Sequence, residues 1–137
     1  MLLVEDNCDV ADTTRGRLED LGYGVTHVPD APSALALLQR QVNSIDLVFS
    51  DIVMPGDLNG LDLARQVRRR HGNQVPILLA TGYSDVAQTA VREGFLLLRK
   101  PYEVAEMRVA IAKALRMTRL RGVDQASLPD PAKDGAR

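Results

Sequence analysis

Five short apolar runs, separated by stretches with helical spacing, set the strongest limit on how this chain can fold. The runs cover residues 2–4, 24–28, 46–50, 76–80 and 95–98. Most are continuous rather than alternating in polarity, which is typical of strands buried on both faces of a parallel sheet. Right-handed crossovers between such strands produce a three-layer α/β sandwich, so the alternation predicts a (βα)₅ chain.

Apolar residues between the runs recur every three or four positions, as on the buried face of a helix. The positions are Val10, Thr14, Leu18 and Leu21, then Ala31, Ala34, Leu35 and Leu38, then Leu61, Ala64 and Val67, and last Val104, Met107, Ile111, Ala114 and Leu115. Gly22, Gly72 and Gly94 stand where helix C-terminal caps are expected. Ser84 is expected to cap the start of the fourth helix.

The length of 137 residues suits one domain, predicted over residues 1–121. Residues 122–137 contain Gly, Pro, Asp and Ala with little apolar periodicity, so we expect a flexible tail there. The formal net charge is −1 and no basic patch stands out. We therefore do not expect this chain to bind nucleic acid directly. Arg68–Arg70 fall at a predicted helix end, where cations interact favourably with the helix dipole.

A single cysteine, Cys8, excludes an internal disulfide and fits a reducing cytosol. No apolar run approaches the roughly 18 residues of a membrane span. We therefore expect a cytoplasmic domain without membrane contact. His27 and His71 have no partner at metal-ligand spacing, so they are expected to be solvated or packing residues.

Chemically complementary side chains stand at the ends of four predicted strands. Glu5 and Asp6 follow the first strand, Asp51 the third, Thr81 the fourth and Lys100 the fifth. Ligands collect at the carboxyl ends of the strands in open α/β sheets, so these groups are expected to meet at one edge. One acid at a strand end is as readily a turn former, but five complementary groups favour a site.

Three neighbouring carboxylates require a cation. Two carboxylates ~4 Å apart repel each other by about 4 kcal/mol at an effective dielectric constant near 20. Lys100 can neutralise one, and a hard divalent ion on Asp6, Asp51 and a backbone carbonyl can neutralise the rest; Mg²⁺ favours such oxygen ligands. The carboxylate of Asp51 can then attack a phosphoryl group in line, as the cations offset the growing charge.

Four motifs in chain order resemble the receiver domains of two-component signalling systems. They are Val4–Asn7, Ser50–Gly56, Ala80–Gly82 and Lys100–Tyr102. Each motif alone is weak, but the ordered set is specific, and the resemblance extends to about Leu120. It implies a flavodoxin-like fold with strand order 2-1-3-4-5. It also implies a phosphorylation switch that catalyses its own phosphoryl transfer and dephosphorylation, rather than a conventional enzyme.

The resemblance implies a role for each residue at the strand ends. Asp51 matches the phosphorylated aspartate. The implied ligands of Mg²⁺, which Mn²⁺ can replace, are Glu5, Asp6, Asp51 and the backbone carbonyl of Val53. Thr81 resembles the switch hydroxyl that closes on the phosphoryl group, and Lys100 resembles the lysine that pairs with it.

Further residues around this site are implied to modulate the reaction. Val53 and Tyr83 would flank the site and tune attack by water, and Gly82 would keep the approach to it open. Pro101 matches the proline after the lysine, where a cis peptide bond is usual in the family. Leu97 stands where the family usually has Tyr or Phe, so the usual aromatic readout is absent.

Two departures concern segment lengths. Residues 54–60 form a loop one residue longer than the commonest receiver loop, a form frequent in receivers fused to sensor histidine kinases. The segment from Thr81 to Lys100 is shorter than usual, so a short fourth helix and a remodelled output face are expected. The long loop, the start of strand one near Met1 and the short tail favour the C-terminal receiver of a hybrid histidine kinase. A stand-alone regulator is the competing interpretation.

The implied phosphodonor is a histidine kinase or a histidine phosphotransfer domain; the output partner and any homodimer remain open. Two other functions fit the sequence less well. A pseudo-receiver that binds partners without phosphorylation is disfavoured because the acids, Thr81 and Lys100 are all present. A phosphohydrolase of the haloacid-dehalogenase kind needs an Asp two residues after its nucleophile, and that position is Val53.

Overall fold

The structure is a computed structural model that describes residues 1–54 and 56–126. Within these ranges, strands and α-helices alternate. The strands are β1 (Leu2–Val4), β2 (Thr26–Val28), β3 (Val48–Asp51), β4 (Ile77–Thr81) and β5 (Leu96–Arg99). The α-helices are α1 (Cys8–Asp20), α2 (Ala31–Gln41), α3 (Gly60–His71), α4 (Ser84–Arg92) and α5 (Val104–Ala126). Short 3-10 turns follow α2 at Val42–Ser44 and α3 at Gly72–Gln74.

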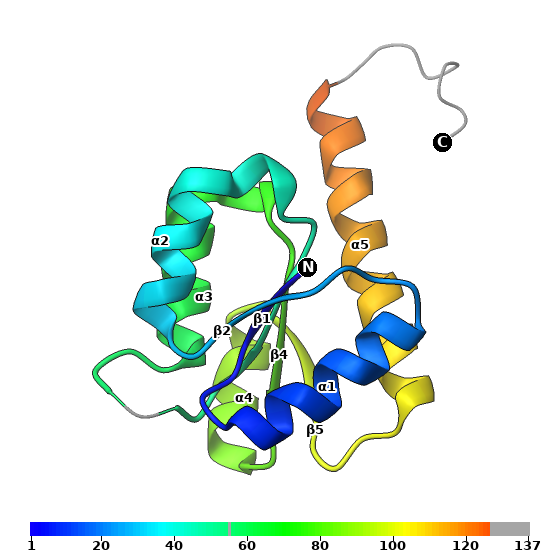
Figure 1. The fold of residues 1–137 in the computed structure, drawn as a ribbon. Coiled ribbons are helices and arrows are strands. Elements are labelled where there is room, and N and C mark those ends of the chain that lie inside the picture. Colours follow the sequence, from blue (N-terminus) through cyan, green and yellow to red (C-terminus); the bar gives the residue numbers. More distant parts are fainter. Residues whose placement is uncertain (55, 127–137) are drawn as a thin grey trace.

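The strands form one parallel sheet in the order β2-β1-β3-β4-β5, which confirms the predicted fold. Leu3 of β1 pairs with His27 of β2 on one side and with Phe49 of β3 on the other. Because the strands run the same way, their carboxyl ends share one edge of the sheet, at the bottom of Figure 1. That edge carries the predicted site residues.

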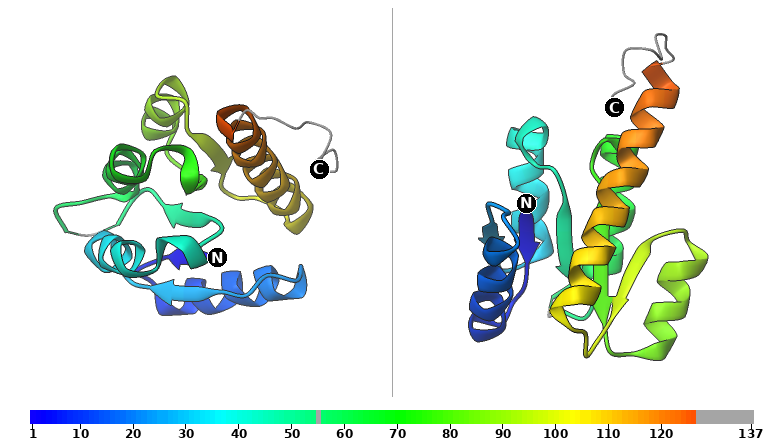
Figure 2. Two further views of the ribbon diagram at one scale, coloured as in Figure 1. Left: turned by 90° about the horizontal axis from the view of Figure 1, so that it is seen from above. Right: turned by 90° about the vertical axis from the view of Figure 1, so that its right-hand side faces the viewer.

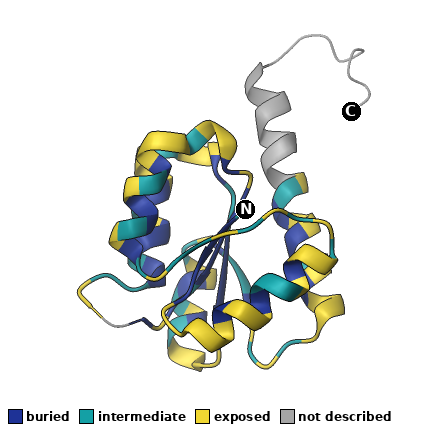
Figure 3. Ribbon diagram, viewed as in Figure 1, coloured by how far each residue is buried: buried dark blue, intermediate teal, exposed yellow. Residues whose placement is uncertain are grey.

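Helices cover both faces of the sheet. α1 and α5 pack on one face, whereas α2, α3 and α4 pack on the other (Figures 1 and 2). The strands and the inward sides of the helices are buried, and the outward sides of the helices are exposed (Figure 3). Burying apolar surface on both faces stabilises a three-layer arrangement and holds the strand ends in fixed positions.

Most of the predicted helix ends and buried helix positions are confirmed, and some are wrong. Gly22 and Gly94 follow α1 and α4 with φ values of +102° and +87°, which confirms them at the helix ends. Val10 and Val104, predicted to face the core, are 40% and 41% exposed. In α1 the buried residues are Ala11, Thr14 and Leu18, so Thr14 and Leu18 are buried as predicted and Ala11 takes the place expected for Val10.

The start of α4 differs from the prediction. The N-cap residue is Tyr83, and Ser84 is the first residue of the helix, so the expectation that Ser84 caps it is wrong. The Ser84 hydroxyl instead accepts a hydrogen bond from Arg99 Nη2 at 3.3 Å. α4 has 9 residues against 11 to 23 in the other described α-helices, in agreement with the expected short helix.

Two arginines of α3 tie that helix to the end of α4. Arg65 donates to both carboxylate oxygens of Glu93, at 2.8 and 2.6 Å. Arg68 donates to the Glu93 carbonyl at 2.6 Å, and its guanidinium lies 3.8 Å from the centroid of the Phe95 ring. A cation over an aromatic face is attracted by the ring quadrupole. These contacts fix the C-terminal end of α4 against α3.

The C-terminal helix is longer than the predicted domain. α5 continues to Ala126, so residues 122–126, which composition assigned to a tail, are helical. The rest of the predicted tail, residues 127–137, lies outside the described residues. No helix in the described part of the chain has the length and apolar character needed to cross a lipid bilayer.

Candidate functional site

Asp51 lies at the end of β3, where its side chain meets Lys100, the cation predicted to neutralise one of the acids. Its backbone pairs with Ala80 of β4, which puts Thr81 one residue further along the same edge. The Asp51 side chain is mostly buried, and its Oδ1 lies 2.6 Å from Lys100 Nζ. The ends of β3 and β5 therefore bring a carboxylate and an ammonium into direct contact.

Glu5 and Asp6 meet Asp51 at the same edge. Carboxylate oxygens of these three residues all lie within 4.8 Å of one another. Glu5 is buried, with 6% of its surface exposed, whereas Asp6 is exposed. Glu5, Asp51 and Lys100 also line one small cavity. The three acids predicted to gather do so, and oxygen donors at this spacing fit a small hard cation.

The charges at this site are not balanced by protein groups alone. Burial above all, and also the nearby charge of Asp51, raise the pKa of Glu5 from 4.5 to about 7, while a hydrogen bond from the Asn7 amide opposes the shift. Burial favours neutral Lys100, but the hydrogen bond with Asp51 and the attraction of both acids outweigh it, so the Lys100 pKa is raised. One lysine lies beside three acids, so a divalent cation could balance the remaining negative charge.

The pKa of Glu5 predicts a pH-dependent stability in protein treated with a chelator. A carboxyl whose pKa is raised on folding stabilises the folded state below its unfolded pKa of 4.5, and this contribution is lost as pH rises through about 7. Relative to Glu5→Gln, the wild type should lose about 1–2 kcal/mol of unfolding free energy over this range, allowing for solvent screening. Urea unfolding of both proteins at several pH values measures this difference. A difference that stays flat with pH contradicts the assignment.

Thr81 is buried, with 3% of its surface exposed, and is held on two sides. Its Oγ1 accepts a hydrogen bond from the Tyr83 amide at 3.1 Å. Its backbone carbonyl accepts one from the Lys100 amide at 3.0 Å, which joins the ends of β4 and β5. The structure thus places Thr81 at the end of β4 and Lys100 directly after the end of the adjacent β5, at the edge that carries Asp51.

Four of the predicted modulating residues follow the carboxyl ends of strands at this edge: Val53, Gly82, Tyr83 and Pro101. Val53 and Tyr83 are 50% and 63% exposed, so both are accessible beside the site. The Lys100–Pro101 peptide bond is cis. A Cβ added at Gly82 would lie 3.8 Å from Lys100 Cβ, an ordinary contact distance.

Leu97 is half-buried and packs beside the core formed by α3, α4 and the sheet. It supplies an aliphatic side chain where the resembled family usually has an aromatic ring. The side chain at position 97 is therefore apolar and has no hydroxyl group.

Two residues near the acids were not predicted as part of the site. A Cβ at Gly60, the first residue of α3, would lie 2.0 Å from the Asp51 carbonyl oxygen. His27 Nε2 lies 2.7 Å from the Glu5 carbonyl oxygen, 22 residues away in the chain. Gly60 precedes a helical apolar pattern, a signal that marks a helix start but not its closeness to Asp51. No sequence signal reveals the contact of His27 with a backbone atom.

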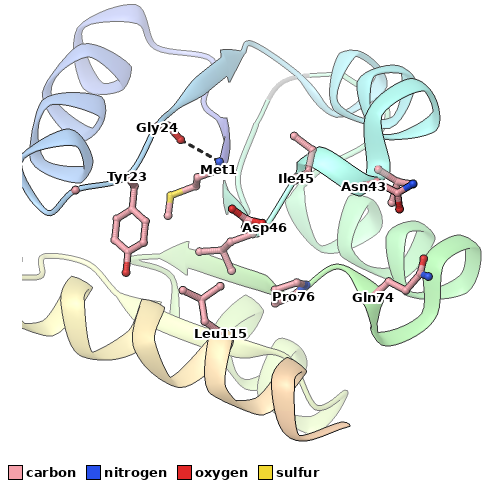
Figure 4. A pocket seen from close by; sticks show the side chains of 12 residues that line it. Met1, Tyr23, Gly24, Asn43, Ile45, Asp46, Gln74, Pro76 and Leu115 are labelled. Carbon is pink, nitrogen blue, oxygen red and sulfur yellow. Dashed lines mark hydrogen bonds between the residues drawn. The ribbon is translucent and has the colours of Figure 1, made fainter. Parts of the chain in front are cut away.

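A hollow of about 760 Å³ lies at the opposite edge of the sheet, beside the amino ends of the strands (Figure 4). Tyr23, Asp46 and Leu115 are among its lining residues, and the Met1 ammonium donates to the Gly24 carbonyl at 2.9 Å there. It contains no cluster of acids and no residue predicted for catalysis. The clustered acids and Lys100 lie instead at the carboxyl ends of the strands, away from this hollow.

Known proteins similar to this chain match most of its length, but some of them are much longer. The alginate biosynthesis transcriptional regulatory protein AlgB of Pseudomonas aeruginosa is 40% identical over 122 residues, which cover 88% of this chain and 26% of that protein. An uncharacterized 14.6 kDa protein of Leptolyngbya boryana is 37% identical over 111 residues, covering 78% of this chain and 82% of that protein. The chain thus spans about a quarter of the length of AlgB.

A solved structure agrees with these sequence relatives. The crystal structure of a response regulator receiver domain protein from Clostridium thermocellum matches with a TM-score of 0.80 at 27% identity, covering 88% of this chain and 96% of that one. The family model of the response regulator receiver domain matches residues 1–112. Together with the sheet order and the acids at its carboxyl edge, this match shows that the chain belongs to the response regulator receiver domain family.

Proposed function

We propose that this receiver domain accepts a phosphoryl group from a phosphohistidine onto Asp51, with Mg²⁺ present, and so acts as a switch in a two-component relay. The observation that carries the proposal is the 2.6 Å contact between Lys100 Nζ and Asp51 Oδ1 beside two further acids. A carboxylate held between an ammonium and a cation site has a nucleophilic oxygen and a means of neutralising an incoming phosphoryl group.

The proposed phosphoryl transfer is a displacement at phosphorus, in which one bond to phosphorus forms as another breaks. A carboxylate oxygen of Asp51 attacks the phosphorus, an O–P bond forms and the N–P bond to the donor imidazole breaks. The imidazole leaves with the electron pair and takes up a proton, while Asp51 becomes an acyl phosphate. Lys100, already beside Asp51, moves its hydrogen bond to a phosphoryl oxygen. Water attack on the same phosphorus later returns the carboxylate and releases phosphate.

The acids of this chain fit the metal that the proposal requires. Glu5, Asp6, Asp51 and the backbone carbonyl of Val53 would hold Mg²⁺ or Mn²⁺, since oxygen donors from a buried and an exposed acid converge beside Asp51. When bound, the metal neutralises negative charge on the phosphoryl oxygens. Its charge also favours the ionised form of Glu5, whose pKa burial has raised.

Phosphorylation would change the surface through Thr81. A phosphoryl group adds negative charge and three acceptor oxygens at the end of β3. The Thr81 hydroxyl, whose oxygen accepts from the Tyr83 amide, can turn its hydrogen toward one of them and move closer to it. This would draw in the turn before α4 and alter the surface there for an output partner. With a histidine kinase or phosphotransfer domain as donor, the domain would act in the cytoplasm.

Uptake of phosphoryl groups from acetyl phosphate tests the proposal. The wild-type chain is incubated with acetyl phosphate and either Mg²⁺ or a chelator, and its intact mass is followed over time. We expect one phosphoryl group per chain with Mg²⁺ and very little with the chelator. Uptake that is absent in both conditions, or equal in both, contradicts the proposal.

A further inference from the structure

We propose that His27 is a positioning residue for the acidic segment Glu5–Asp6, through a hydrogen bond from its Nε2 to the Glu5 carbonyl. The inference rests on the proposed function, because it assigns Glu5 and Asp6 to Mg²⁺. His27 is half-buried in β2 and pairs with Leu3 of β1. Its Nε2 lies 2.7 Å from the Glu5 carbonyl oxygen, a short distance for a hydrogen bond of this kind.

The direction of this hydrogen bond follows from chemistry. A carbonyl oxygen only accepts, so His27 Nε2 must carry the hydrogen. Both the neutral ring with a proton on Nε2 and the doubly protonated ring meet this requirement. The contact therefore needs no change in the charge of His27.

The His27 contact lies at the point where the pairing of β1 with β2 ends. The pairing of β1 with β2 ends at Val4 and Val28, so the Glu5 carbonyl lies beyond the last paired residues. The Glu5 amide still donates to the Val28 carbonyl at 3.1 Å, and the Asn7 amide donates to Glu5 Oε2 at 3.1 Å. The bond from His27 adds a third fixed point, on the carbonyl that leads directly into Asp6.

The next residues are fixed from the other side. The Asn7 side chain accepts from the Val10 amide at 3.0 Å and caps α1. Glu5 and Asp6 therefore lie between a helix cap at Asn7 and the His27 contact. These constraints set how closely the two acids approach Asp51. Carboxylate oxygens of all three residues lie within 4.8 Å of one another.

A loosened segment should weaken metal binding more than it weakens the fold. Mg²⁺ demands near-ideal octahedral geometry, so small displacements of its ligands reduce affinity. Groups that hold metal ligands in place are commonly worth 10- to 100-fold in affinity. Because His27 holds a backbone atom next to Asp6, its loss should act on both acids at once.

Two substitutions of His27 separate the hydrogen bond from side-chain packing. His27→Leu removes the donor but keeps an apolar group of similar size. His27→Gln places an amide N–H at a reach similar to that of Nε2. The Kd for Mg²⁺ alone is measured on the full chain by calorimetric titration, and urea unfolding gives the stability of each variant. Thr26→Val, an exposed change in the same strand, is the matched control.

We expect His27→Leu to weaken Mg²⁺ binding about 10-fold. His27→Gln and Thr26→Val should stay within about threefold of the wild type, so that the conservative variant rescues affinity. If His27→Leu does not fold, His27→Asn, whose amide is too short to reach Glu5, takes its place in the same comparison.

A folded His27→Leu with wild-type affinity overturns the positioning role, and so does a His27→Gln that is as weak as His27→Leu. A wild type that takes up phosphoryl groups with Mg²⁺ while His27→Leu keeps its affinity overturns this inference alone. A wild type that binds no Mg²⁺ overturns both this inference and the proposed function.

Discussion

Replacing Asp51 with asparagine should lower phosphoryl uptake from acetyl phosphate by about 100-fold or more, because the substitution removes the attacking group itself. The amide has nearly the same shape as the carboxylate but is neutral and a poor nucleophile. It also removes the negative charge beside Lys100 Nζ, which lies 2.6 Å from Asp51 Oδ1. Intact mass measured over time with Mg²⁺ present gives the rate of uptake.

A matched acid separates loss of the nucleophile from loss of general negative charge. Asp57→Asn removes an exposed carboxylate from the loop after β3 that is not among the three clustered acids. It should take up phosphoryl groups at a rate close to that of the wild type. Near-wild-type uptake by Asp51→Asn, with its fold intact by circular dichroism, would show that another residue is the acceptor.

Gly60→Ala should destabilise the domain by about 3 kcal/mol and lower its melting temperature by about 10 °C. A Cβ at this position would lie 2.0 Å from the Asp51 carbonyl oxygen and 2.7 Å from Ile52 Cα. Both obstacles are backbone atoms, so neither can move aside as a flexible side chain would. The Gly60 amide also donates to the Ile52 carbonyl at 2.7 Å, which holds α3 against the end of β3.

The same substitution should slow the chemistry, because relief of the clash moves the backbone of Asp51. We expect phosphoryl uptake by the folded fraction to fall about 10-fold, since a misplaced reacting group loses its alignment. Gly16→Ala is the matched control: it lies inside α1, and a Cβ there has no heavy atom within 4 Å. Gly16→Ala should stabilise the domain by up to about 1 kcal/mol, as alanine favours helices over glycine. Equal melting temperatures for the two variants contradict the predicted clash.

Much of the fold could be predicted because parallel sheets leave a simple pattern. Continuous apolar runs mark strands that are covered on both faces, and the helical spacing between them marks the covering helices. The candidate site followed from the same pattern, since parallel strands end at one edge. Asp51, Thr81 and Lys100 were placed together for that reason, and the structure brings them to that edge.

The contacts that could not be predicted involve backbone atoms or surface side chains far apart in the chain. His27 bonds a carbonyl that any residue at position 5 would supply, so no pair of residue types marks the contact. Arg65 reaches Glu93 across 28 residues from an otherwise ordinary charged helix face. Ser84 suited a helix cap by type, but the helix begins one residue earlier than expected, and its hydroxyl meets Arg99 instead.

The central claim is that Asp51 carries the phosphoryl group, and locating that group tests it most directly. The wild-type chain is phosphorylated with acetyl phosphate and Mg²⁺, and then treated with borohydride, which reduces an acyl phosphate of aspartate to homoserine. Peptide mass spectrometry then reads the position. We predict homoserine at position 51 alone. Homoserine at position 6 or 57, or a phosphoryl group on His27 or His71 with position 51 unchanged, would contradict the claim.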